Sequence, residues 1–288
     1  MTPWILAARP KTLSASIAPV LVGSAMAVHD GHPLRPAIFL CTLAGSILIQ
    51  IATNYVNDAL DFKKGSDTSA RLGPLRVTQA GLLNASAVMR GAYIAIVFAA
   101  LCGIPLIIRG GWPLLAIGAA SIIAAYIYTG GPYPLAYNGL GELFVMLFFG
   151  LIAVGGTYYV QALTISVAVL SMGTAVGSLA IVLLAINNLR DIDNDRVSNK
   201  RTVAVRFGAR FARFEIAAAA LLPFAIVAIL ALVRRSWWLA LPLVALPLAG
   251  VLLRKVAASS GAALNRCLAL SGLLQWMFGI LAALAWLA

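Results

Sequence analysis

Long apolar stretches alternate with short polar connections along the whole chain. A helix needs roughly 20 apolar residues to cross a bilayer, and nine stretches approach that length. The intervals between them leave almost nothing for a water-soluble domain. The pattern therefore predicts an all-α integral membrane protein, one domain over residues 1–288, with nine transmembrane helices. Their expected positions are about 12–28, 37–57, 86–108, 112–128, 139–161, 164–189, 211–233, 236–253 and 264–287.

The composition agrees, because 62% of the residues are hydrophobic and only 10% are charged. A net charge of +12 can also indicate a nucleic-acid-binding protein. The positions of the basic residues along the chain distinguish this possibility from a charge bias that sets membrane topology. In a nine-span chain most of the 21 Lys and Arg residues share a side with the N-terminus. The positive-inside rule then places the N-terminus in the cytoplasm and the C-terminus outside. We expect the lipid bilayer, and no nucleic acid, as the partner of these charges.

Acidic residues gather in two clusters, at the inner ends of the second and sixth stretches. In the first, Asp58 and Asp61 are three residues apart; in the second, Asp191 and Asp195 are four apart. Residues at these spacings share a helix face, whereas Asp193 points elsewhere. Because four spans separate the clusters, both must face the same side of the membrane. The pattern also suggests a four-plus-four helical repeat with a ninth helix added, around a central cavity open to the cytoplasm.

Two carboxylate pairs on one side would repel each other unless cations lay between them. Mg²⁺ is commonly bound by carboxylates together with substrate phosphate oxygens, and a basic loop follows each cluster to flank a diphosphate. The alternative is that these basic residues only set the topology. A lipid-soluble diphosphate would lay its tail along apolar helices, and metal ions would stabilise the departing diphosphate. The flanking cations are Lys63, Lys64, Arg71, Arg76, Lys200 and Arg201.

An uncharged connection rich in tyrosine lies between the fourth and fifth stretches, at 126–139. Tyr126 and Tyr128 either belong to an aromatic belt at the membrane interface or line the cavity. Glu142, at the start of the fifth stretch, faces the same cavity or the headgroups.

The motifs Asn57-Asp58-x-x-Asp61 and Asp191-x-x-x-Asp195 resemble those of the UbiA-type intramembrane aromatic prenyltransferases, a superfamily with nine helices and two aspartate-rich motifs. The resemblance covers nearly the whole chain. It is nearest to the dihydroxynaphthoate branch, through the segments 61–67, 71–76, 128–142 and 187–202.

The 4-hydroxybenzoate branch typically carries a Tyr-x-x-x-Lys motif after the fourth helix. Counting from Tyr126 or Tyr128, this chain has Gly130 or Pro132 in place of the lysine. The difference favours a naphthoate acceptor over a benzoate.

The resemblance implies that Asp58, Asp61, Asp191 and Asp195 are catalytic and hold Mg²⁺, with Asn57 helping. It implies transfer of a polyprenyl group from a polyprenyl diphosphate to 1,4-dihydroxy-2-naphthoate, with loss of CO₂ and diphosphate, giving demethylmenaquinone in a bacterial cytoplasmic membrane. Asp67, Asp193 and Glu142 are the candidates for a general base in this reaction or for binding the acceptor. The alternatives are another acceptor (4-hydroxybenzoate, haem or a chlorophyllide) or a secondary transporter, which would hold its acids nearer mid-membrane. The expected substrate-binding residues are Asn57, Lys63, Arg71, Arg76, Tyr126, Tyr128, Asn188, Lys200 and Arg201.

Overall fold

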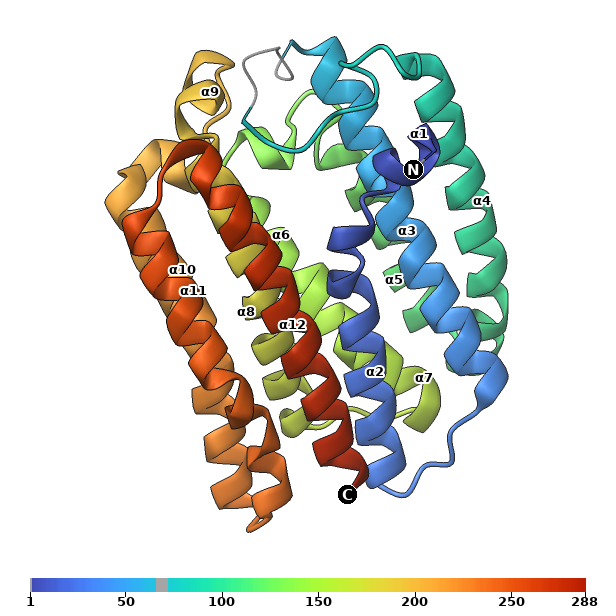
Figure 1. Ribbon diagram of the computed structural model, residues 1–288. Coiled ribbons are helices and arrows are strands. Elements are labelled where there is room, and N and C mark those ends of the chain that lie inside the picture. Colours follow the sequence, from blue (N-terminus) through green and yellow to red (C-terminus); the bar gives the residue numbers. More distant parts are fainter. Residues whose placement is uncertain (1, 66–71) are drawn as a thin grey trace.

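The computed structural model describes residues 2–65 and 72–288, and every regular element in these ranges is a helix. The long helices form one bundle, with the N-terminus toward one end and the C-terminus at the other (Figure 1). The elements are α1 (Pro3–Ala8), η1 (Pro10–Thr12), α2 (Ser14–His29), α3 (Pro36–Lys63), α4 (Ala85–Gly110), α5 (Trp112–Ile127), η2 (Leu135–Tyr137), α6 (Gly141–Val145), η3 (Met146–Ile152), α7 (Ala153–Ala162), α8 (Val167–Arg190), α9 (Ile192–Val197), α10 (Val203–Val233), η4 (Trp237–Ala245), α11 (Leu246–Ala258), η5 (Gly261–Ala263) and α12 (Leu264–Leu287).

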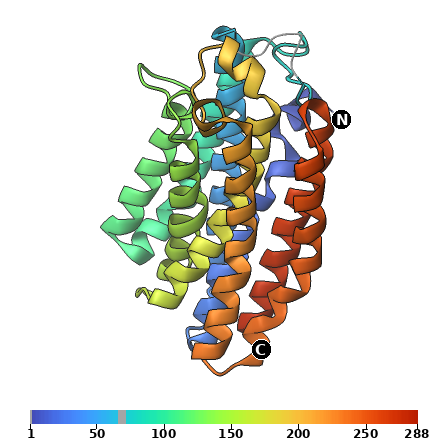
Figure 2. The same ribbon diagram turned by 90° about the vertical axis from the view of Figure 1, so that its left-hand side faces the viewer.

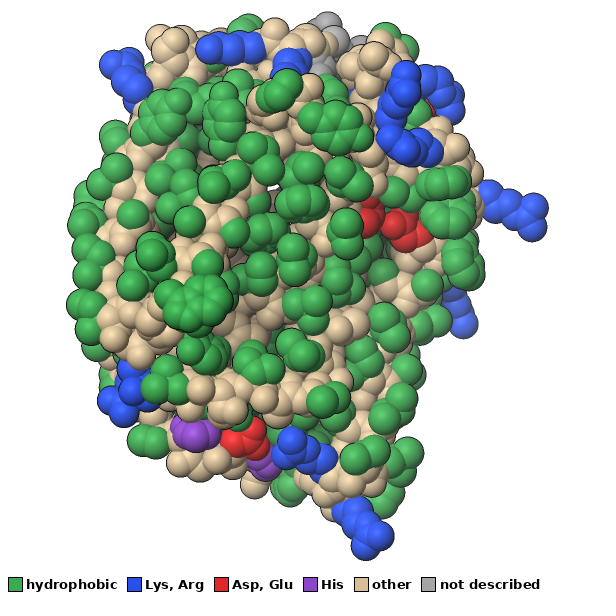
Figure 3. Space-filling view, turned by 180° about the vertical axis from the view of Figure 1, so that it is seen from behind, with side chains coloured by type: hydrophobic (Ala, Val, Ile, Leu, Met, Phe, Trp, Pro, Cys, Tyr) green, Lys and Arg blue, Asp and Glu red, His purple; other side chains and the backbone are tan. Residues whose placement is uncertain are grey.

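The bundle has the helices of a multi-pass membrane protein. Among the described residues, seven helices are long and apolar enough to cross a bilayer, or eight if the bent pair Pro3–Thr12 and Ser14–His29 is one span. Views at right angles show these helices running along one axis (Figure 2). Hydrophobic side chains cover the middle of the face opposite to Figure 1, and most Lys and Arg side chains lie toward its ends (Figure 3). The fourth expected span, 112–128, corresponds to α5, which has only 16 residues, so the count of nine and the repeat stay predictions.

Helix α8 lies at the centre of the fold, because small residues let its neighbours approach closely. A Cβ atom on Gly177 would lie 2.9 Å from the Cα of Gly150 in η3, and one on Gly173 would lie 3.2 Å from the Gly150 carbonyl oxygen. Such contacts between small residues are the usual means of packing helices in a membrane. The close packing holds the end of α8, and with it the second acidic cluster, in a fixed place.

The two acidic clusters lie at the same end of the bundle, as expected. Helix α3 runs through Asp58 and Asp61 to Lys63, and α8 ends at Arg190, beside the short helix α9 (Figure 1). Asp191 interrupts the helix between α8 and α9, so the second cluster is not on one continuous helix. The N–H of Asp195 still donates to the Asp191 carbonyl oxygen at 2.8 Å, which keeps the two residues one turn apart.

Candidate active site

A polar cavity of about 170 Å³ lies between the two acidic clusters. Asn57 and Asp61 line it from α3, Asn188 from α8, and Lys200 from the connection after α9. Residues more than 120 positions apart in the chain thus face one space, which the parity of the spans had indicated. The other polar or charged lining residues are Arg9, Thr12, Gln50, Thr53, Asn54, Arg76, Tyr128, Thr129, Glu142, Asn187 and Thr202.

Asp61 is the carboxylate of the first cluster that faces the polar cavity. Its Oδ2 lies 3.1 Å from Nη2 of Arg76, and its Oδ1 accepts a hydrogen bond of 2.9 Å from the Tyr137 hydroxyl. Both oxygens are therefore held in place by groups that arrive from other segments. The Arg76 guanidinium is itself buried, so a positive group and a negative group meet at the cavity wall.

Asp58 was expected to face the cavity together with Asp61, but its carboxylate is directed to a neighbouring turn of the backbone. Its two carboxylate oxygens accept the backbone N–H groups of Thr78 at 3.0 Å and Val77 at 3.3 Å. It is 1% exposed and is not among the described residues that line the polar cavity. In this arrangement Asp58 anchors the turn that begins after Arg76, whereas Asp61 faces the polar cavity. A shared metal ion for the two carboxylates stays a prediction.

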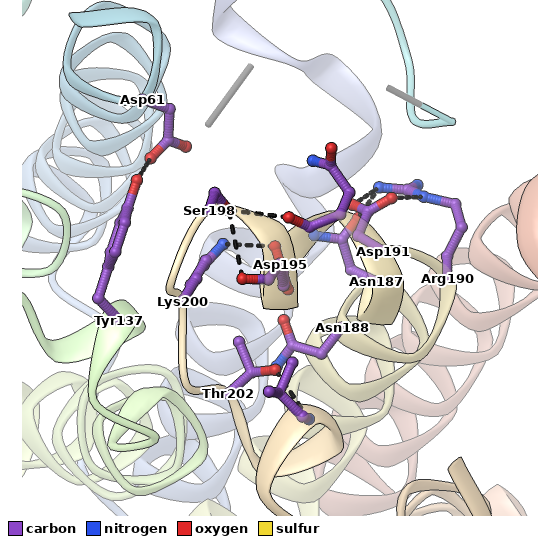
Figure 4. A network of polar contacts seen from close by, with 12 residues as sticks. Asp61, Tyr137, Asn187, Asn188, Arg190, Asp191, Asp195, Ser198, Lys200 and Thr202 are labelled. Carbon is purple, nitrogen blue, oxygen red and sulfur yellow. Dashed lines mark hydrogen bonds and ion pairs between the residues drawn. The ribbon is translucent and has the colours of Figure 1, made fainter. Parts of the chain in front are cut away.

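Asp191 is paired with Arg190 at the junction of α8 and α9. The guanidinium donates from Nε to Oδ1 at 2.8 Å and from Nη2 to Oδ2 at 2.5 Å. Arg190 also donates to Asn187 in α8 and to Asn265 in α12, and its side chain is fully buried. The helix break thus has a physical cause, since a buried ion pair satisfies both charges there (Figure 4).

The remaining acids of the second cluster separate into one buried and one exposed group. Asp195 is buried, and its Oδ1 lies 3.7 Å from Nζ of Lys200 (Figure 4). The Asp193 side chain is 91% exposed and pairs only loosely, at 3.4 Å, with an exposed Arg196. The helix-face argument had separated Asp193 from its neighbours, and the structure gives it the place of a solvated surface charge.

Tyr137 links the two clusters; it belongs to the tyrosine-rich connection 126–139 but was not among the expected substrate-binding residues. Its hydroxyl is bound to Asp61, while its ring lies 4.6 Å from Nζ of Lys64 and 5.6 Å from Nζ of Lys200. Its carbonyl oxygen accepts the backbone N–H of Arg201 at 2.9 Å. The desolvation of Lys64 lowers the pKa of its amine, and Asp61 acts in the opposite direction.

Other predicted site residues differ in how close they come to the polar cavity. Lys63, Arg201 and Tyr126 are exposed and do not line it in the described part of the chain. Arg71, like the candidate base Asp67, lies outside the described residues.

Of the predicted substrate-binding residues, the two asparagines do face the polar cavity. The Oδ1 atom of Asn57 accepts the Thr129 hydroxyl at 2.6 Å. The Nδ2 group of Asn188 donates to Glu142 at 2.9 Å. Glu142 is therefore a cavity residue rather than a headgroup contact.

Tyr128 lies at the bottom of the polar cavity, directly after α5. Desolvation raises the pKa of its hydroxyl, and the carboxylates of Glu142, Asp61 and Asp195 add to the effect. The hydroxyl therefore stays protonated at neutral pH. It can donate a hydrogen bond to a ligand in the cavity.

A second, apolar cavity of about 380 Å³ adjoins the polar one. It lies among α2, α3, α4, α5, η3 and α7, and its wall contains aliphatic and small side chains, for example Gly45, Ile107 and Gly118. The two cavities share five lining residues, which we call the neck. These are Gln50, Thr53, Tyr128, Val145 and Phe149.

The donor atoms at the polar cavity are chemically suited to a hard divalent cation, because carboxylate and amide oxygens are the ligands Mg²⁺ prefers. Asn57 and Asp61 offer such oxygens at the wall. Within residues 2–65 and 72–288, however, no three acidic, His or Cys side chains are close enough together to hold an ion. Metal binding would therefore require the aspartates to exchange some of their present partners.

The fold and the site define an intramembrane prenyltransferase: residues 16–278 match the UbiA prenyltransferase family, and the chain belongs to this family. It is 41% identical over 216 residues to the 1,4-dihydroxy-2-naphthoate octaprenyltransferase of Escherichia coli (strain K12), which covers 73% of this chain and 70% of that protein. The enzyme of the same name from Mycobacterium tuberculosis is 39% identical over 249 residues, covering 85% and 83%. The resemblance seen in the sequence is confirmed.

Solved structures show the same fold at low sequence identity. A UbiA homolog from Archaeoglobus fulgidus bound to GPP and Mg²⁺ has a TM-score of 0.69 and 13% identity, covering 97% of this chain and 98% of that one. An apo UbiA homolog from Aeropyrum pernix K1 has a TM-score of 0.71 and 14% identity, covering 92% and 96%.

Proposed function

We propose that this protein transfers a polyprenyl group from a polyprenyl diphosphate to 1,4-dihydroxy-2-naphthoate, with Mg²⁺. The observation that carries the proposal is the pair of cavities joined at the neck. One is polar and bordered by cations and carboxylates, and the other is larger and apolar. A prenyl diphosphate has this division between a charged head and an apolar tail, so its first carbon would lie at the neck.

The diphosphate head is held by Arg76 and Lys200, which line the polar cavity from opposite clusters. Asn57 and Asp61 would hold Mg²⁺ at the wall of the polar cavity. Asp58, Asp191 and Asp195 are not among the described residues that line it, and each would join the ion only after a change of partners. When bound, the ion neutralises the charge that develops on the departing diphosphate. The neck walls exclude water from the prenyl cation.

The reaction balances without an oxidant. The bond between the prenyl carbon and the diphosphate oxygen breaks, and a carbon–carbon bond forms at the ring carbon that bears the carboxylate. The adjacent hydroxyl gives up its proton as it becomes a carbonyl. Loss of CO₂ then leaves an enolate, which takes the proton back. The product is the quinol form of demethylmenaquinone, with diphosphate and CO₂ released.

The choice of acceptor rests on the relatives that carry the dihydroxynaphthoate name. We place the polar cavity on the cytoplasmic side of a bacterial inner membrane, because the basic loops lie at that end. One assay tests the proposal: purified protein with Mg²⁺, a labelled prenyl diphosphate, and dihydroxynaphthoate or hydroxybenzoate in parallel. We expect labelled prenyl naphthalenediol; exclusive product from hydroxybenzoate would contradict the acceptor, and no transfer to either would contradict the function.

The hydroxyl of Tyr137 should matter for metal affinity. Tyr137→Phe removes the hydrogen bond to Asp61 but keeps the ring beside Lys64 and Lys200. Because partners behind a metal ligand typically contribute about 10- to 100-fold in affinity, we expect Mn²⁺ binding to weaken within that range. Electron paramagnetic resonance titration without substrate measures it. Tyr133→Phe, in the same connection and 60% exposed, is the control; equal binding by both variants would refute the role of Tyr137.

The apolar cavity should limit the length of the prenyl chain that the protein accepts. Gly118 lines it, and a Cβ atom there would meet no heavy atom within 4 Å. Gly118→Phe places a ring at this wall, so we expect turnover with octaprenyl diphosphate to fall about 10-fold or more relative to geranyl diphosphate. Gly250 also has no neighbour within 4 Å but lines neither cavity, and Gly250→Phe should leave the ratio unchanged. An unchanged ratio in Gly118→Phe would mean that the tail lies elsewhere.

A further inference from the structure

The neck has the composition of a small aromatic-binding site. Phe149 and Val145 supply apolar surface, Tyr128 supplies a ring with a hydroxyl, and Gln50 and Thr53 supply polar atoms. Thr53 uses its own proton inside α3, where it donates to the Ile49 carbonyl at 2.8 Å. The polar groups left for a ligand are therefore the Tyr128 hydroxyl and the Gln50 amide, while the Thr53 oxygen can only accept.

The orientation of the Gln50 amide is fixed by the hydrogen bonds of Thr12. The Thr12 hydroxyl donates its single proton to the Arg9 carbonyl oxygen at 2.9 Å. Its oxygen accepts two amide groups, from Gln50 Nε2 at 3.3 Å and from Asn54 Nδ2 at 3.1 Å. A hydroxyl oxygen has two acceptor positions, so Thr12 is saturated. Turning the amide of Gln50 over would set oxygen against oxygen, and Nε2 therefore stays on Thr12.

In this orientation the side-chain oxygen of Gln50, Oε1, receives no hydrogen bond from the described residues. The side chain is 7% exposed, and within the described residues its Oε1 atom has no hydrogen-bond partner. Burial of an acceptor without a partner is unfavourable, and such groups in native proteins call for an explanation. A prenyl diphosphate has no N–H or O–H group in its tail or at its first carbon. The prenyl diphosphate therefore does not supply the donor for this oxygen.

We propose that Gln50 is a specificity-determining residue, which accepts a hydrogen bond from a ring hydroxyl of the aromatic acceptor at the neck. Val145 and Phe149 contact the ring of the acceptor, and Tyr128 donates to its second oxygen substituent. The acceptor then lies beside the first prenyl carbon, where head and tail cavities meet. This inference rests on the proposed prenyl transfer and adds the class of acceptor that the neck selects, an aromatic ring with a free hydroxyl.

The test compares Gln50→Met with Gln275→Met. Methionine keeps the length of the side chain and removes the acceptor oxygen. Gln275 is also buried, where it accepts the Ser14 hydroxyl at 2.9 Å, but it lines neither cavity. Loss of a buried hydrogen bond of this kind corresponds to about 5- to 100-fold in affinity. We expect the KM for dihydroxynaphthoate to rise within that range in Gln50→Met only, with the KM for the prenyl diphosphate within about twofold of wild type.

A second measurement removes the hydroxyl from the ligand instead of the protein. Mono-O-methyl ethers of the diol are tested for binding to protein loaded with an unreactive prenyl thiodiphosphate. Wild type should bind one ether more weakly than the diol, whereas Gln50→Met should not distinguish the two. Equal discrimination in both proteins, or a parallel rise in the KM for the prenyl diphosphate, would overturn the role of Gln50. Failure of the prenyl transfer itself would appear separately, as no labelled product in wild type.

Discussion

Asp61→Asn is expected to abolish prenyl transfer, by about 1,000-fold or more, while the protein stays folded in the membrane. Asparagine keeps the shape of the side chain but removes the negative charge that faces Arg76 and Tyr137. With that charge gone, the polar cavity loses the carboxylate on α3 that is proposed to hold the metal ion. Removal of a single preorganised electrostatic group already lowers kcat by about 100- to 1,000-fold, and loss of the metal ion lowers it further.

The effect of Asp61→Asn should be distinguished from a general loss of negative charge. Asp193 belongs to the same end of the molecule but is 91% exposed, so Asp193→Asn should turn over like wild type. Both variants are compared by labelled-product formation across a range of Mg²⁺ concentrations. Gel filtration and thermal melting in detergent confirm folding. If Asp61→Asn kept more than a tenth of the wild-type rate, Asp61 would not be a metal ligand.

Much of the fold could be predicted from the lengths of the apolar stretches, because a bilayer fixes the length of a helix that crosses it. Helix ends could not be predicted as well. Helix α3 continues past the expected end at residue 57 to Lys63, and in this extension the backbone N–H groups of Val77 and Thr78 satisfy the buried Asp58 carboxylate. No local pattern carries this information. The break at Asp191 was missed for the same reason, since its cause is the burial of Arg190 between α8 and α12.

The convergence of the two clusters on one cavity followed from the sequence, because an even number of crossings returns the chain to one side. The individual roles within the site did not follow. Tyr137 meets Asp61 across 76 positions, and Gln50 meets Thr12 across 38. Both contacts depend on tertiary packing. Helical spacing correctly placed Asp58 and Asp61 one turn apart on α3. It could not show that the backbone N–H groups of Val77 and Thr78, which follow Arg76, donate hydrogen bonds to the Asp58 carboxylate.

Arg190→Met is expected to destabilise the protein strongly. The change leaves the Asp191 carboxylate buried without its guanidinium, and breaking a buried ion pair on one side typically costs about 3–5 kcal/mol. It also removes the bond to Asn187 within α8 and the bond to Asn265, which joins α8 to α12. The free energy of unfolding, measured by titration with SDS, should fall within that range. A change below about 1 kcal/mol would show that the pair is open to water.

The double variant Arg190→Met with Asp191→Asn separates stability from catalysis. Removing both charges replaces a broken ion pair by neutral groups, so the double variant should recover much of the stability lost in Arg190→Met alone. We expect its turnover to stay lost, because Asp191 is proposed to exchange Arg190 for the metal when substrate binds. Arg190 would then act as the group that holds this carboxylate ready between turnovers. Recovery of turnover together with stability would instead mean that the pair is structural, and that the metal is held by Asp61, Asn57 and Asp195 without Asp191.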